Sequence, residues 1–76
     1  MNYEAHIECW MYDADTAQWL STDADWLAIQ YDDAKDIARA AGKTPTGAVS
    51  LKSFTETGVA NDDGLFYDFI FNVAVA

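Results

Sequence analysis

Residues 2–12 of the chain alternate between two sides of different character. One side of such a segment carries Tyr3, Ala5, Ile7, Cys9 and Met11, and the other carries Glu4, His6, Glu8, Trp10 and Tyr12. A period of two residues is that of a β-strand with one face in the core, so we predict a strand here. Its polar side ends in two aromatic residues, which is unusual for a face that meets only water.

The segments that follow are short and alternate between acidic and apolar. Residues 13–18 and 22–25 are rich in Asp, whose side chain bonds nearby backbone groups and favours turns. The Trp-Leu-Ser of residues 19–21 is predicted to return as an antiparallel strand. Residues 26–30 form an apolar run that fits either a strand or a helical turn. Each of the two Trp-Leu pairs is expected to anchor in the core or at its rim.

Residues 32–42 carry the period of an α-helix. The apolar positions recur at spacings of three and four residues, at Ala34, Ile37, Ala38 and Ala41. Asp32 is suited to cap the start of this helix, and Gly42 is suited to the left-handed position that ends it. Because the apolar stripe consists mostly of Ala, the helix is expected to approach a sheet closely.

Two further strands are predicted at residues 48–55 and 65–75, separated by a loop whose Asn-Asp-Asp-Gly (61–64) is typical of a hairpin. The last strand is apolar on both sides. It is therefore either central and covered twice, or covered once and used for association. The element order is ββ(β)αββ. We predict one α+β domain over residues 1–76, an antiparallel sheet of about four strands with one helix packed on it.

Composition limits where such a domain would work. With 76 residues, 51% of them hydrophobic, the chain forms one small folded domain rather than a disordered one. A secreted domain of this size would normally need disulfides, and the only cysteine is Cys9. The start of the chain has no signal-peptide pattern, and the apolar segment 65–76 is too short to span a bilayer. We therefore expect a cytoplasmic protein without membrane contact.

Charge is the strongest compositional signal. Thirteen acidic residues oppose four basic ones, which gives a net charge of −9. Solubility needs a magnitude of only about 2–8 in a small domain. Direct binding to DNA, RNA or an anionic membrane depends on Lys and Arg, so the excess of acid argues against these ligands and favours a basic partner.

The residues that carry chemistry do not form a motif. Neither Asp-Ala-Asp, at 13–15 or at 23–25, continues with the ligands and glycine of an EF-hand loop. Zinc would need about four Cys or His ligands, and His6 and Cys9 lie on opposite sides of the predicted strand. No nucleophile–base pair or phosphate-binding loop is present. We therefore predict no catalytic residue, metal site or cofactor, and a protein that is not an enzyme.

The acids and the exposed aromatics are the candidate binding residues. Turn chemistry and a solvated surface explain each Asp separately, but an ordinary surface mixes both signs of charge. Residues two apart on an extended chain lie about 6.6 Å from each other, so Asp-x-Asp pairs are expected to imitate the phosphates of a nucleic acid. The predicted partner-binding residues are Glu4, Glu8, Trp10, Tyr12, Asp13, Asp15, Asp23, Asp25, Asp32, Asp33 and Asp36.

In size and charge the whole chain resembles the small acidic phage proteins that inhibit host defence, namely the anti-CRISPR and anti-restriction DNA mimics. No motif carries this resemblance. It implies a non-enzymatic inhibitor in the host cytoplasm, which binds a basic nucleic-acid-handling complex such as a CRISPR effector and occludes it, by DNA mimicry or through apolar contacts.

Two other functions are compatible with the sequence. One is a small structural domain of a halophile, in which acidic residues keep the protein hydrated in high salt. The other is an antitoxin-like or adaptor subunit, whose apolar C-terminal strand would pair with a partner or form a homodimer. A halophile's charge would cover all faces evenly, whereas a mimic's charge would gather on one face.

Overall fold

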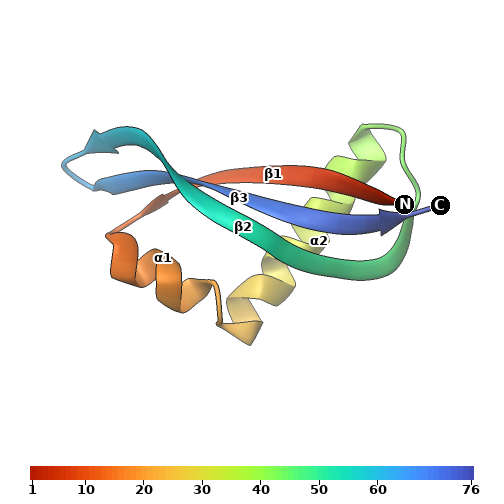
Figure 1. The fold of residues 1–76 in the computed structure, drawn as a ribbon, viewed down its shortest axis with the longest axis horizontal. Coiled ribbons are helices and arrows are strands. Elements are labelled where there is room, and N and C mark those ends of the chain that lie inside the picture. The colour runs from red at the N-terminus through yellow and green to blue at the C-terminus, as the bar shows by residue number, and fades with distance from the viewer.

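The computed structural model describes residues 1–76 and contains five elements (Figure 1). In chain order they are β1 (Asn2–Met11), α1 (Ala14–Leu20), α2 (Ala24–Ala40), β2 (Pro45–Asn61) and β3 (Gly64–Val75). The strands form one antiparallel sheet in the order β1-β3-β2. The α+β class is confirmed. The predicted four strands and single helix are wrong, because the order is βααββ.

The C-terminal strand β3 is the centre of the sheet. It pairs with β1 without interruption from Asn2–Ala74 to Met11–Leu65. On its other side it pairs with β2, whose register shifts three times. Both edges of β3 are therefore occupied, and β1 and β2 are the two edge strands.

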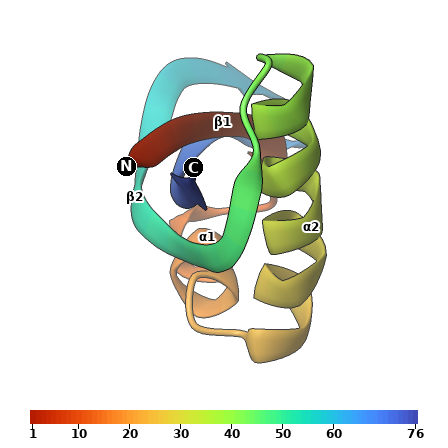
Figure 2. The ribbon, with the colours of Figure 1, turned by 90° about the vertical axis from the view of Figure 1, so that its right-hand side faces the viewer.

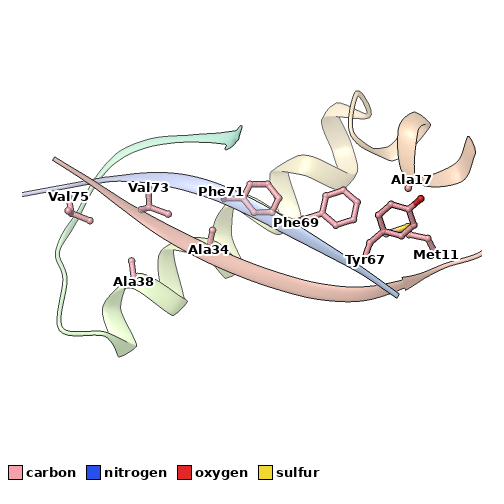
Figure 3. Close-up of a cluster of buried hydrophobic side chains, with 10 residues drawn as sticks. Met11, Ala17, Ala34, Ala38, Tyr67, Phe69, Phe71, Val73 and Val75 are labelled. Atoms are coloured by element: carbon pink, nitrogen blue, oxygen red, sulfur yellow. The ribbon is translucent and has the colours of Figure 1, made fainter. Parts of the chain in front are cut away.

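Both helices pack against the same face of this sheet, where the core forms. Figure 2 shows α2 standing along one side of the strands. The alternate residues of β3 from Tyr67 to Val75 are buried on this face (Figure 3). Ala17 of α1 and Ala34 and Ala38 of α2 are fully buried against them. The absence of bulk at these helical positions lets the backbones approach the sheet, as the Ala-rich stripe predicted.

Aromatic contacts fill the space between α2 and the sheet. Trp26 meets Phe69 edge-on with ring centroids 5.0 Å apart, and Tyr31 meets Phe71 in the same manner at 5.8 Å. From β2, Phe54 stacks on Phe69 at 5.3 Å. Such pairs add about 0.5–1.5 kcal/mol each beyond the area they bury. They matter here because only ten of 76 residues are buried.

The opposite face of the sheet has no helix over it. We call it the open face, and it consists of Glu4, His6, Glu8 and Trp10 of β1, Phe66, Asp68, Ile70 and Asn72 of β3, and Lys52 of β2. The β3 residues among these are only half-buried. Of the two alternatives predicted for the C-terminal strand, the structure therefore combines parts of both: β3 is central, yet it is covered once.

The acidic segments predicted as turns begin helices instead. The backbone N–H of Thr16 donates to the Asp13 carboxylate over 2.7 Å, so Asp13 is the N-cap of α1. Residues 19–21, predicted as a strand, end that helix. The second helix begins at Ala24 and includes the ambiguous run 26–30. The predicted start at Asp32 is therefore wrong, and Asp32 lies on the exposed side of α2.

The C-terminal hairpin is predicted more closely. Asn61 pairs with Gly64, which leaves Asp62 and Asp63 as the two turn residues. The Asn61 side chain also accepts a hydrogen bond from the Asp63 backbone N–H at 2.8 Å. The strand before this turn is longer than predicted, because β2 runs over residues 45–61 rather than 48–55. Neither α1 nor α2 is long and apolar enough to cross a membrane.

Candidate functional site

The predicted binding residues separate onto opposite sides of the sheet. Seven of them belong to the helical layer, which we call the helix surface: Asp13, Asp15, Asp23, Asp25, Asp32, Asp33 and Asp36. Glu4, Glu8 and Trp10 lie on the open face. Tyr12 follows the end of β1 in the bend that leads into α1, and its side chain is 80% exposed. The predicted set is therefore two surfaces rather than one.

Four acids of the helix surface lie at helix starts. Asp13 and Asp23 occupy the N-cap positions, and Asp15 and Asp25 lie in the first turns. The helix dipole favours negative charge there. The hydrogen bond from the Thr16 backbone lowers the pKa of the Asp13 carboxyl, so this group stays ionised into acid solution. These four acids therefore have a structural role in addition to any role in binding.

The remaining acids extend along the exposed side of α2. Asp25, Asp32 and Asp36 are separated by seven and four residues, so they share one side of the helix at axial intervals of about 10 and 6 Å. Arg39 donates to Asp36 over 2.7 Å and neutralises that end. The apolar Ile29, which is 61% exposed, interrupts the row.

This arrangement corrects the spacing expected of the Asp-x-Asp pairs. On an extended chain the two carboxylates would share a side. In an α-helix, residues two apart point about 200° away from each other. Asp15 and Asp25 are helical while Asp13 and Asp23 are extended N-caps, so neither pair lies on the continuous extended strand that the spacing assumed. Asp32 and Asp36, one turn apart on α2, lie at an axial interval of about 6 Å.

The charge is distributed unevenly along the fold. Residues 1–34 contain eight acidic residues and no Lys or Arg, whereas residues 35–76 contain five acidic and four basic residues. Two of the bases, Lys35 and Arg39, lie in the C-terminal half of α2. Lys52 is bound to Glu4 on the open face. The segment from Asp13 to Asp33 therefore contains no positive charge, and Lys35, one helical turn after Asp32, is the first base to follow it.

Exposed aromatic side chains adjoin this acidic region. Trp19, on α1, is 63% exposed, and Tyr12 precedes the same helix. Sequence reasoning placed Trp19 in the core or at its rim, but the neighbouring Leu20 packs against the core in its place. Trp26 does lie against the core, as predicted. Adjacent residues point in different directions both in a strand and in a helix, so the separation of Trp19 from Leu20 did not depend on the type of element.

The open face contains its own polar network. Nδ1 of His6 lies 2.9 Å from Oδ2 of Asp68. Lys52 and Glu4 form an ion pair above the sheet, which lowers the pKa of the Glu4 carboxyl. Oδ1 of Asp68 is buried and has no hydrogen-bond partner. Sequence reasoning missed Asp68, because it lies within a strand that is otherwise almost wholly apolar.

Comparisons with protein-family models, with curated proteins and with solved structures give no match to this chain. A function must therefore be argued from the two surfaces themselves. Both consist of side chains that recognise other molecules by charge and by aromatic contact.

Neither surface encloses a cavity, and no group of three or more His, Cys, Asp or Glu side chains is arranged to hold a metal ion. Cys9 points to the helix-covered side of β1, where burial raises the pKa of its thiol.

Proposed function

We propose that this protein is a small acidic inhibitor of the phage type, which binds a basic nucleic-acid-handling complex and blocks its binding of nucleic acid. A CRISPR effector is the favoured partner. The observation that carries the proposal is the helix surface, where six Asp residues between Asp13 and Asp33 lie without a Lys or Arg beside the exposed Tyr12 and Trp19.

Two physical effects would act together at this surface. A single-sign field attracts a positively charged channel and raises the association rate. Exposed Trp and Tyr side chains supply the large contact area that dominates interface energies. Because Arg39 pairs with Asp36, mimicry of a phosphate backbone would rest on the acids from Asp13 to Asp33.

The uneven charge favours an inhibitor over a halophile's structural domain. A halophile would spread acids evenly over all faces, whereas here the helix surface carries seven acids and the open face carries three, of which Glu4 and Asp68 are paired with Lys52 and His6. An adaptor subunit that associates through the C-terminal strand would have to use the open face, because both edges of β3 are already paired. This second role would need an apolar face, and the open face contains three carboxylates.

The helix surface is tested with two matched charge reversals. Affinity capture at low and high salt first identifies the basic complex. Asp32→Lys with Asp33→Lys then reverses two exposed charges inside α2, away from the caps and first turns. Glu56→Lys with Asp62→Lys makes the same change in charge on the C-terminal hairpin. The measurement is the concentration of each protein that halves binding of target DNA by the complex.

We expect the helix variant to lose at least about tenfold in potency, which corresponds to about 1.4 kcal/mol of binding free energy. The hairpin variant should retain most of the potency. Equal losses in both variants would show that only net charge matters, and the helix surface would then be rejected. Failure of the wild-type protein to inhibit any captured complex would reject the function itself.

A further inference from the structure

The outer edge of β1 is an unpaired strand edge. Val75 donates its backbone N–H to the Met1 carbonyl over 2.9 Å. Because the residues of an antiparallel strand alternate between its two sides, this bond directs the odd-numbered residues of β1 toward β3. The N–H and C=O groups of Glu4, His6, Glu8 and Trp10 therefore point away from the sheet, and β1 pairs with no second strand.

This edge is more regular than the other one. All ten residues of β1 keep a continuous register with β3. The β2 edge begins at Pro45 and is broken by three register shifts, which are features that prevent a strand edge from pairing. α2 packs against β1 from the core side. Of the two edges, β1 is the one that presents a straight row of backbone donors and acceptors.

The side chains above this edge select the charge of a partner. Glu8 lies directly opposite Asp68 in the register, and like charges in that position repel each other. His6 contacts only one oxygen of Asp68, and the other is buried without a partner. A cationic side chain beside Glu8 would offset the repulsion between Glu8 and Asp68. Trp10, 47% exposed and 4.8 Å from Phe66 by ring centroids, offers such a cation an aromatic face.

Charge disfavours a second copy of this chain. Two antiparallel registers of β1 on β1 share the greatest overlap: one places Glu4 of each copy opposite Glu8 of the other, and the second places Glu8 opposite His6. Each copy also carries a net charge of −9. Two such edges repel each other, whereas a strand with Lys or Arg at alternate positions complements them.

We propose that the outer edge of β1, from Glu4 to Trp10, binds an extended basic segment of another protein, which joins the sheet as an antiparallel fourth strand. Its Lys and Arg side chains lie on the open face beside Glu8, Asp68 and Trp10, and its backbone bonds the outward groups of β1. This surface is separate from the helix surface, so the proposal does not depend on the proposed function.

A synthetic peptide tests the pairing directly. The probe is a ten-residue capped peptide in which Lys or Arg alternates with Thr or Val, added to the ¹⁵N-labelled full chain. In an antiparallel ladder, two residues that exchange hydrogen bonds carry their side chains on the same face. N-methylation at every Lys and Arg therefore blocks the groups that face β1. N-methylation at every Thr and Val, the matched control, blocks the groups that face solvent.

We expect chemical-shift changes and at least about tenfold slower hydrogen exchange at the amides of Glu4, His6, Glu8 and Trp10. Methylation at Lys and Arg should abolish both effects, and methylation at Thr and Val should leave them. No saturable binding up to about 1 mM peptide would overturn the proposal, as would equal effects of the two methylations. A dimer of the chain without peptide, detected by light scattering, in which hydrogen exchange shows the same amides protected, would identify a second copy as the occupant. That result would also overturn the proposal.

Charge reversal separates this edge from the helix surface. Glu8→Lys should weaken the basic peptide at least about tenfold, and a peptide with Glu in place of Lys and Arg should bind this variant better than the wild type. Asp33→Lys makes the same change in net charge on α2 and should leave peptide binding unchanged. Equal weakening by both variants would reduce the interaction to nonspecific attraction and reject strand addition.

Discussion

Gly64 shows how one residue positions the end of β1 against the C-terminal hairpin. Its φ is +147°, a conformation that side chains rarely permit. A Cβ at this position would overlap the carbonyl oxygen of Met11 and lie 3.3 Å from the Cα of Tyr12. The hairpin can therefore approach β1 only because this residue has no side chain. The exposed Tyr12 begins at this junction, so Gly64 also determines where that aromatic ring is presented.

Gly64→Ala is expected to be strongly destabilising, with Gly47→Ala as its control. Gly47 also has a positive φ, of +123°, but nothing lies within 4 Å of a Cβ built there. We expect about 1 kcal/mol of lost stability from the backbone strain at Gly47, and about 3 kcal/mol from strain plus overlap at Gly64. Urea unfolding of both variants measures the difference. Equal losses would mean that the contact with Met11 is relieved at little cost.

At the scale of elements, β1, the last hairpin and the end of α2 could be predicted because each has a strong local signal. The alternation over residues 2–12 fits only a strand, and Asn-Asp-Asp-Gly fits only a hairpin turn. The Asp-rich segments fit either a turn or the start of a helix. An Asp side chain bonds a backbone N–H two or three residues ahead both in a turn and at a helix N-cap, so only the residues that follow distinguish them. After Asp23 that signal was present, since Leu27, Tyr31, Ala34 and Ala38 continue one apolar stripe.

The candidate site was predictable in composition but not in geometry. Asp residues at turns or helix starts are exposed in either case, so their accessibility was foreseeable. The side of the sheet on which they lie was not, because it depends on whether residues 13–30 form strands or helices. Trp19 and Trp26 illustrate the limit: each precedes a Leu, yet only Trp26 finds a ring, Phe69, to pack against. Such contacts depend on the tertiary arrangement.

The N-cap of α1 provides a test at this scale. Asp13→Ala removes the acceptor of the Thr16 N–H, and we expect the melting temperature at pH 7 to fall by a few degrees. Asp13→Asn retains an acceptor and should lose less. The folded state lowers the pKa of Asp13, so the charged carboxylate contributes stability above its ordinary pKa, and this contribution is lost as pH falls through the folded pKa.

The difference between the wild type and Asp13→Ala should therefore shrink when thermal melts are repeated at decreasing pH below about 4. Asp13→Asn supplies the control, because its cap does not titrate and its own difference from Asp13→Ala should persist. A gap between wild type and Asp13→Ala that stays constant down to pH 2 would contradict a charged cap.

At the scale of the whole molecule, a thin core opposes a large charge. One layer of two helices covers one side of a three-stranded sheet, so the open face contributes little burial. Thirteen acids repel each other within dimensions of 41 × 22 × 15 Å. The pairs Glu4–Lys52 and Asp36–Arg39 are exposed, and exposed ion pairs contribute little to stability. Repulsion should therefore outweigh attraction.

This balance predicts that salt stabilises the protein. Raising NaCl from 0.01 M to 0.1 M shortens the screening length from about 30 Å to about 10 Å, which is less than the length of the molecule. We expect the melting temperature to rise by several degrees, because repulsion is screened over most of the surface. Asp32→Lys with Asp33→Lys lowers the net charge from −9 to −5 and should show a smaller rise. A melting temperature that falls with salt would mean that the few ion pairs outweigh the repulsion. The acids of the helix surface would then repel each other less than their number indicates.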